Sequence, residues 1–305
     1  MNPVIVTTLK ASAYIGLALL ASPLLEGVIR KIKAFIQSRK GPPVTQPYFD
    51  LAKLLVKEDL SSTPSLVARL APPAAFASVL AASFFVPFGM AAPAARAGDL
   101  FLFIYLITFS STCVMAGALS HSSPFSHIGS SREMMMLITI EAVILISLLI
   151  VGVSGHTALL SSLVVTPFRF SFVLGLICYL FAMQAMIGKL PFDIAEAEQE
   201  IMDGPFIEYS GPSLALFKWT FYMKQLLFGS LFFNLFVGWP HLSAWGWIGT
   251  VVSFATNFLA VLILGLLVVL IDATNPRLRI DQSLRFFAGL IGVALLGMGL
   301  AAFGL

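Results

Sequence analysis

Long apolar runs dominate this chain and point to a helical membrane protein. Of its 305 residues, 58% are hydrophobic and 11% are charged, whereas soluble domains usually carry about 25% charged residues. A helix that crosses a bilayer needs about 20 mostly apolar residues. Eight such runs occur, at approximately 4–25, 70–90, 100–119, 134–153, 170–188, 213–237, 247–271 and 286–304. The sequence therefore predicts one all-α membrane domain over 1–305 with eight transmembrane helices.

The first run has a competing interpretation as a secretory signal peptide. Ala18 and Ala21 have the spacing of small residues at a cleavage site. Lys10 interrupts the run, however, and no positively charged segment precedes it. A first transmembrane helix that stays in the protein is therefore the preferred interpretation.

The distribution of Lys and Arg predicts the orientation in the membrane. The loops after the first, third, fifth and seventh runs hold thirteen of these residues, and the opposite side holds three, Lys10, Arg96 and Arg169. Positive residues favour the cytoplasmic side, so both termini are expected outside and the large loops inside. Thirteen of the fifteen carboxylates lie in the same inner loops. We therefore expect a partner protein to dock on the cytoplasmic face.

Cysteines and histidines give no pattern of a metal site. Cys113 and Cys178 lie in apolar runs, and two cysteines cannot supply the four ligands of an iron–sulfur cluster or structural zinc. The four histidines lack a metal-ligand spacing and are interpreted as surface residues: His121, His127, His156 and His241. No basic nucleic-acid patch is present. Any metal chemistry is expected in a partner.

An acidic segment lies between the fifth and sixth runs. Six of the 15 carboxylates fall within it, at Asp193, Glu196, Glu198, Glu200, Asp203 and Glu208. If 193–203 is a helix, the four carboxylates at 193, 196, 200 and 203 share an arc of about 80°. Such a face suits a proton relay, because like charges raise one another's pKa. A solvated amphipathic loop helix is the alternative, and spacing alone favours it.

Beyond the first run, three charged residues lie inside the apolar runs. Glu141 is about 10 Å into its run, where an unpaired carboxylate costs on the order of 2–3 kcal/mol or more. Lys224 is near the middle of its run, and we expect it to take part in a buried charge relay. Structural hydrogen bonding is the alternative for Glu141, and snorkelling to the membrane surface explains Lys218 as well as a relay does.

Five ordered elements resemble the cytoplasmic-loop signatures of the heel subunit of respiratory complex I. They are Arg39-Lys40-Gly41-Pro42, then Gln46-Pro47 with Asp50, Lys53-Leu54-Leu55 and Lys57-Glu58, then Pro191-Phe192-Asp193 with Glu196-Ala197-Glu198, then Glu208-Tyr209-Ser210, and finally Arg277-Leu278-Arg279-Ile280-Asp281-Gln282. That family is eight-helical with both termini outside, in agreement with the orientation inferred above.

Within this family, the chain is similar to the branch of membrane-bound nickel–iron (NiFe) hydrogenases of the formate hydrogenlyase type. The similarity lies in Ser123-Pro124-Phe125, Ile128-Gly129 and Ser131-Arg132-Glu133. Three places depart from the quinone-reducing branch: the short Pro43-Val44-Thr45 link, Gly188-Lys189-Leu190 in place of Asn-Arg, and Phe221 in place of a glutamate. These departures lie where complex I shapes quinone access, so quinone use is in doubt.

The resemblance also implies functional residues. In the family, acidic residues line a route from the redox module to the membrane arm, and their positions correspond here to Glu141, Asp193, Glu196, Glu198, Glu200 and Glu208. Lys189, Lys218 and Lys224 are assigned to the same route by their charge only. Inner-loop positions expected to hold peripheral subunits are Arg39, Asp50, Lys53, Arg279 and Asp281.

A non-catalytic subunit of an oxidoreductase complex is the resulting expectation. It would sit in a prokaryotic cytoplasmic membrane, anchor the large and small hydrogenase subunits, and contact antiporter-like membrane subunits. The chain itself would bind no cofactor, with the nickel–iron centre and iron–sulfur clusters in those partners, and it would couple their electron transfer to proton or sodium movement. A quinone-site heel subunit and a purely structural anchor remain the alternatives.

Overall fold

The computed structural model describes residues 3–60, 63, 65–89, 92–95, 97–160, 163, 169–237 and 246–304. Over these residues the fold is helical, apart from an isolated β-bridge between Asp99 and Leu159. The elements are α1 (Pro3–Ile36), α2 (Gln46–Val56), α3 (Leu66–Ser83), α4 (Leu100–Leu119), α5 (Pro124–Gly155), α6 (Phe170–Met186), α7 (Glu198–Ile201), the 3₁₀ turn η1 (Gly204–Phe206), α8 (Gly211–Phe232), the π-helical turn η2 (Phe233–Val237), α9 (Gly246–Thr274) and α10 (Ile280–Ala302). The predicted all-α class is confirmed.

A helix occupies each of the eight predicted apolar runs. Six of these helices are long and apolar enough to cross a membrane: α1, α3, α4, α5, α9 and α10. The apolar helix α6 has only 17 residues, and α8 carries two lysines. The described part of the chain is thus a multi-pass membrane protein.

The helix ends differ from the predicted run ends where polar residues continue a helix. α1 extends to Ile36 and α5 begins at Pro124, because a helix satisfies its own backbone hydrogen bonds and need not end where apolar residues end. In contrast, α3 ends at Ser83 rather than near 90. The extensions carry charged groups beyond the apolar parts of α1 and α5.

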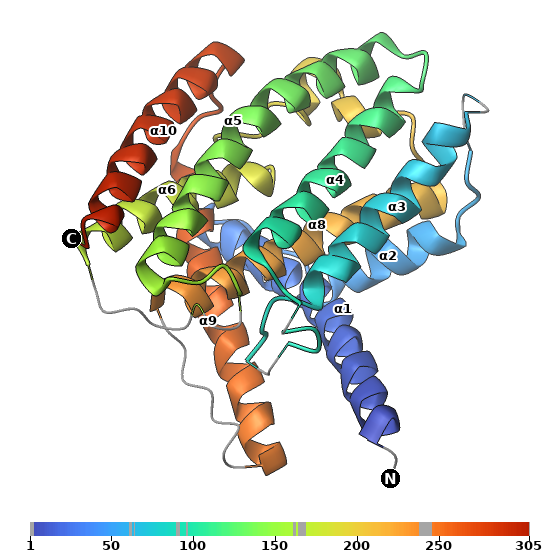
Figure 1. The fold of residues 1–305 in the computed structure, drawn as a ribbon. Helices are drawn as coiled ribbons and strands as arrows, with labels where there is room; N and C mark the ends of the chain where they lie inside the picture. The colour runs from blue at the N-terminus through green and yellow to red at the C-terminus, as the bar shows by residue number, and fades with distance from the viewer. Residues whose placement is uncertain are drawn as a thin grey trace.

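The helices are arranged around α8. α3, α4, α5 and α10 form a row in which each helix packs on the next (Figure 1). Behind this row, α8 contacts α1, α2, α3, α6 and α9. Every residue from 222 to 232 is buried, as expected for a helix covered on all sides. Lys224 is therefore held in the centre of the molecule.

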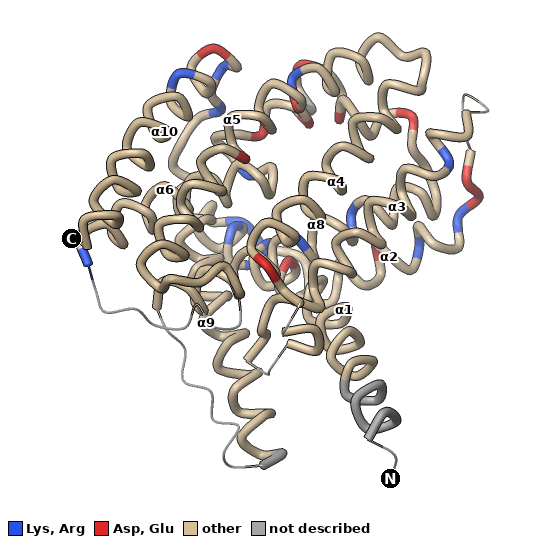
Figure 2. The backbone as a smooth tube through the Cα atoms, viewed as in Figure 1, with Lys and Arg blue, Asp and Glu red and all other residues tan. Residues whose placement is uncertain are grey.

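Charged residues gather at helix ends and connections. Figure 2 shows long stretches of α3, α4 and α9 without any. α4 has no charged residue, and α9 has one, Asp272 in its last turn. This separation leaves the segment between α6 and α8 as the main acidic region.

Candidate functional site

The acidic segment between α6 and α8 is mostly irregular. Within 193–203 only Glu198–Ile201 is helical, so the continuous helix assumed for this stretch does not form. Met202, Asp203 and Gly204 all have positive φ angles, of 50°, 69° and 44°, which a right-handed helix cannot contain. A Cβ atom at Gly204 would lie 2.2 Å from the carbonyl oxygen of Ala195. Only glycine fits this close turn.

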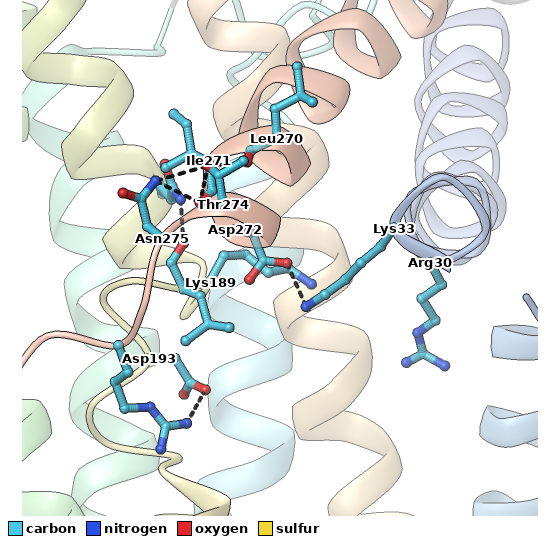
Figure 3. Close-up of polar contacts among 12 residues, drawn as sticks. Arg30, Lys33, Lys189, Asp193, Leu270, Ile271, Asp272, Thr274 and Asn275 are labelled. Atoms are coloured by element: carbon cyan, nitrogen blue, oxygen red, sulfur yellow. Dashed lines mark hydrogen bonds and ion pairs between the residues drawn. The ribbon is translucent and has the colours of Figure 1, made fainter. Parts of the chain in front are cut away.

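Ion pairs fix this irregular segment to three helices or their flanks. Lys189 pairs with Glu26 of α1 at 3.2 Å, and Asp193 pairs with Arg277, just before α10, at 2.8 Å (Figure 3). On the exposed side, Arg132 of α5 pairs with Glu200 at 2.6 Å. The carboxylates are therefore distributed among different partners rather than aligned on one helical face.

A second group of charges joins α1 to α2, α8 and α9. Arg30 pairs with Glu26 and Asp50, both at 3.1 Å, and donates a hydrogen bond to the Tyr222 hydroxyl at 2.8 Å. One turn further along α1, Lys33 pairs with the buried carboxylate of Asp272 at 2.6 Å (Figure 3). The polar end of α1 is thus the centre of an ion-pair network.

Glu196 lies where two cavities meet. The larger cavity has about 1340 Å³ of empty space, is open, and is lined by Glu26, Lys189 and Glu196 among others. The smaller has about 460 Å³ and is lined by Glu133, Asp193 and Glu196. A carboxyl group at this junction faces both the open face and the helix core.

Burial alters the acidity of two carboxyl groups in this segment. Burial, with a smaller contribution from the neighbouring carboxylates of Asp193 and Glu133, raises the pKa of Glu196 to about 8, while Lys189 opposes the shift. The pKa of Asp193 is also raised by burial, with Arg277 opposing the shift. By contrast, Arg132 lowers the pKa of the exposed Glu200. Glu196 can therefore exchange a proton near neutral pH.

Lys224 lies deeper in the bundle and interacts electrostatically with two carboxylates of α5. It is 1% exposed and its ammonium donates a hydrogen bond to Ser111 of α4 at 2.8 Å. Glu133, Glu141 and Glu196 are the carboxylates that interact with it electrostatically. Because Glu133 and Glu141 are eight residues apart, the helical rise separates their backbones by about 12 Å.

Glu141 lines a third, small cavity. This space of about 220 Å³ lies against Thr108 of α4 and Phe228 of α8. One carboxylate oxygen of Glu141 is buried and has no hydrogen-bond partner within the described residues. An unsatisfied buried oxygen is costly in an apolar site. Glu196, Glu133, Lys224 and Glu141 thus form a line of ionisable groups from the acidic segment into the helix core.

The remaining predicted pathway residues do not join this line. Lys218 is exposed on α8 at the larger cavity, and the side chain of Glu198 lies outside the described residues. Glu208 lines a separate pocket with His121. His121 itself is 2% exposed, so its interpretation as a surface residue is wrong, and His241 lies outside the described residues.

The predicted docking residues fall into two environments. Arg39 and Lys53 are exposed, and Arg279 pairs with Asp281 at 3.2 Å at the exposed start of α10. Asp50, however, pairs with Arg30 inside the ion-pair network. Asp50 therefore has an internal structural contact in addition to any contact with a partner.

Sequence reasoning missed three carboxylates of the site. Glu26 and Asp272 each stand at the polar end of an apolar run, and Glu133 stands just before one. The one local signal was the spacing of Glu26 and Arg30, four residues apart on α1. The described residues contain no group of three or more His, Cys, Asp or Glu side chains arranged to hold a metal ion.

The sequence matches a known protein family over nearly its whole length. Residues 9–302 match the family model described as NADH dehydrogenase. Hydrogenase-4 component C of Escherichia coli K12 is 34% identical, with 88% of each chain covered. Formate hydrogenlyase subunit 4 of the same organism is 30% identical, with 90% of this chain and 92% of that protein covered.

A solved structure has the same fold. It is described as the membrane-bound sulfane sulfur reductase, an archaeal respiratory membrane complex, and one of its chains superposes with a TM-score of 0.90. The two chains are 27% identical, and the match covers 97% of this chain and 99% of the other.

Proposed function

The chain belongs to the NADH dehydrogenase family, and from this premise we propose that it is the membrane anchor and coupling subunit of a hydrogenase complex related to complex I. Two of its relatives, hydrogenase-4 component C and formate hydrogenlyase subunit 4, support the hydrogenase branch. In this proposal the chain holds nickel–iron and iron–sulfur subunits on its cytoplasmic face and antiporter-like subunits in the membrane.

The proposed topology has eight spans, with α6 and α8 completing the six longer helices. Thirteen Lys and Arg residues in one set of loops against three in the other support a cytoplasmic position for the acidic segment. Both termini then lie outside a prokaryotic cytoplasmic membrane. α8 is accommodated because Lys224, its deeper lysine, is covered by neighbouring helices rather than by lipid.

The observation that carries the coupling proposal is the line Glu196, Glu133, Lys224 and Glu141. Reduction of a partner cluster near the acidic segment changes the local charge, and Glu196 responds by exchanging a proton. That change shifts the charge balance at Glu133 and Lys224, which both interact electrostatically with Glu196, and Lys224 in turn interacts with Glu141. The low dielectric constant of the protein interior strengthens the electrostatic interaction between successive groups.

Glu141→Gln tests this proposal in the intact complex. The amide keeps the shape of the side chain but removes its proton exchange and charge. We expect ion translocation, measured in membrane vesicles, to fall by at least about tenfold, equivalent to about 1.4 kcal/mol in the barrier. Hydrogen evolution with an artificial donor should remain. Equal loss of both activities in an assembled complex, or loss of neither, would contradict the coupling role.

Quinone binding is a second candidate function, because the open cavity of about 1340 Å³ is lined by both charged and aromatic groups, among them Lys218, Phe221 and Tyr222. A cleft of this kind fits a substituted ring with a polar edge. Purification of the tagged complex with nickel and flavin assays separates the two functions. Nickel without flavin supports the hydrogenase branch, whereas flavin and photo-crosslinking of a quinone to α1 or α8 support quinone reduction.

A further inference from the structure

A polar pocket lies apart from the proposed pathway, where the ends of α3 and α4 approach the start of α8. It has a cavity volume of about 280 Å³ and is lined by Asp59, Ser65, Arg69, His121, Glu208 and Tyr209, among others. None of these residues lines the two smaller cavities of the pathway, and only Tyr209 among them also lines the larger one. The pocket therefore needs an explanation of its own.

Several of its polar groups are already engaged. Asp59 accepts a hydrogen bond from Ser213 at 2.6 Å, in the first turn of α8, where the helix dipole favours a carboxylate. The Tyr209 hydroxyl donates to the Ala68 carbonyl at 3.3 Å. The His121 ring lies edge-on to the Tyr209 ring, with centroids 4.8 Å apart. These side chains line the pocket, but the contacts above are with other residues of the chain.

His121 contributes no positive charge to the pocket at neutral pH. Burial lowers its pKa, although Glu208 opposes that shift. The imidazole is therefore neutral under ordinary conditions, and the positive charge among the lining residues comes from Arg69.

Two opposite charges remain available in the pocket. Neither Arg69 nor Glu208 forms an ion pair within 4.0 Å with another residue in the described part of the chain. They line the same cavity without contacting each other. A ligand that carries both an anion and a cation on its headgroup is complementary to these two charges.

An apolar edge leads out of the pocket. Leu60, which lines it, is 66% exposed, and Leu66 and Leu70 on the first turns of α3 are 71% and 54% exposed. α3 is one of the helices able to cross a membrane. The pocket thus lies beside a surface suited to acyl chains, at the polar end of a membrane helix.

We propose that this pocket binds a zwitterionic aminophospholipid, with the lipid phosphate at Arg69, the primary ammonium at Glu208 and an acyl chain along Leu66 and Leu70. A guanidinium forms paired hydrogen bonds with phosphate. A primary ammonium donates three hydrogen bonds, whereas a choline headgroup donates none. A purely anionic lipid could also place its phosphate at Arg69, but it has no cation to pair with Glu208. The inference does not depend on the coupling role.

Lipid competition on the intact complex tests the proposal. The tagged complex is exchanged into nanodiscs that contain equal parts of phosphatidylethanolamine, phosphatidylglycerol and phosphatidylcholine. Lipids that remain after a detergent wash are then counted by mass spectrometry. We expect at least one phosphatidylethanolamine per chain to be retained, with roughly fivefold preference over either other lipid, about 1 kcal/mol. Equal retention of phosphatidylglycerol would overturn the zwitterion assignment.

Variants assign the two charges. Arg69→Ala should abolish lipid retention, and Arg69→Lys should restore part of it. Glu208→Gln should still retain some lipid but should lose the preference for phosphatidylethanolamine over phosphatidylcholine. Arg285→Ala, an exposed arginine on α10, is the matched control and should retain lipid normally. An unchanged preference in Glu208→Gln, or displacement of the wild-type lipid by soluble phosphoethanolamine alone, would refute the site as described.

Discussion

The ammonium of Lys189 lies 3.2 Å from both carboxylate oxygens of Glu26. These residues are 163 positions apart in the chain, and their contact ties the start of the acidic segment to α1. Glu26 is buried and also accepts a hydrogen bond from Arg30 at 3.1 Å. One carboxylate therefore connects the ion-pair network of α1 with the segment that carries Glu196.

Lys189→Met should loosen this connection without removing an apolar contact. Glu26 would keep Arg30 but lose half of its charge compensation, which costs about 1–3 kcal/mol for a buried group. Limited proteolysis of the purified complex should then cut faster within 188–204. A double-mutant cycle with Glu26→Gln should show coupling, since the second change removes the group that Lys189 compensates.

Lys31→Met is the matched control. Lys31 lies on α1, the helix that carries Glu26, but it is exposed and forms no ion pair with the described residues. Its proteolysis pattern should equal that of the wild type. If Lys31→Met and Lys189→Met accelerate cleavage equally, the effect is one of net charge, and the Glu26 contact does not hold the segment.

The raised pKa of Glu196 predicts a pH-dependent stability. The folded state holds its proton up to about pH 8, whereas an unfolded glutamate loses it near its ordinary value of 4.5. The folded state thus binds more protons in this window, so stability is full below pH 4.5 and falls as pH rises to about 8. Glu196→Gln should flatten that fall in thermal-shift measurements from about pH 5 to about pH 9.

Glu200→Gln provides the comparison of opposite sign. Arg132 lowers the pKa of Glu200, so its contribution is present above its ordinary pKa and is lost as pH falls. Its removal should leave the alkaline slope unchanged. A wild-type slope that survives in Glu196→Gln would show that another group titrates in this window.

The positions of the helices were predictable because a run of about 20 apolar residues indicates a segment that is buried in lipid or protein as a helix. The acidic segment was not, because its conformation depends on contacts distant in sequence. Asp193 and Glu200 share a predicted helical face, yet they pair with Arg277 and Arg132 on different sides. Alanine and glutamate content favours a helix only weakly, and the positive φ angles of 202–204 override it.

The candidate site was predicted in part for the same reason. Glu141 and Lys224 stood out because a lone charge in an apolar run is anomalous. Glu26 and Glu133 did not, since each lies at the edge of such a run among other polar residues. Only the folded arrangement shows that Glu133 and Glu196 line one cavity.

Gly129→Ala should disturb the contact between α5 and the turn that follows the acidic segment. A Cβ atom there would lie 2.7 Å from Cδ of Pro205 and 2.8 Å from Cα of Gly204, so backbone must move. We expect a loss of about 1–3 kcal/mol, measured as a lower melting temperature of the complex. Gly292→Ala on α10, where nothing lies within 4 Å, should instead be neutral or stabilising. Equal stability of the two variants would mean that this turn adapts freely.

Lys224→Met separates a relay from a purely structural anchor. Methionine fills a similar volume in the buried site, so the helices should still assemble. Glu133 and Glu141 would lose the cation that interacts with both, so the line of ionisable groups would be interrupted between them. Ion translocation should fall by at least about tenfold, with hydrogen evolution from an artificial donor retained. Lys218→Met, on the exposed side of the same helix, should translocate normally. A purely structural anchor predicts a different result. Lys224→Met would then translocate ions at the wild-type rate whenever the complex assembles, because no charge would have to pass between Glu133 and Glu141.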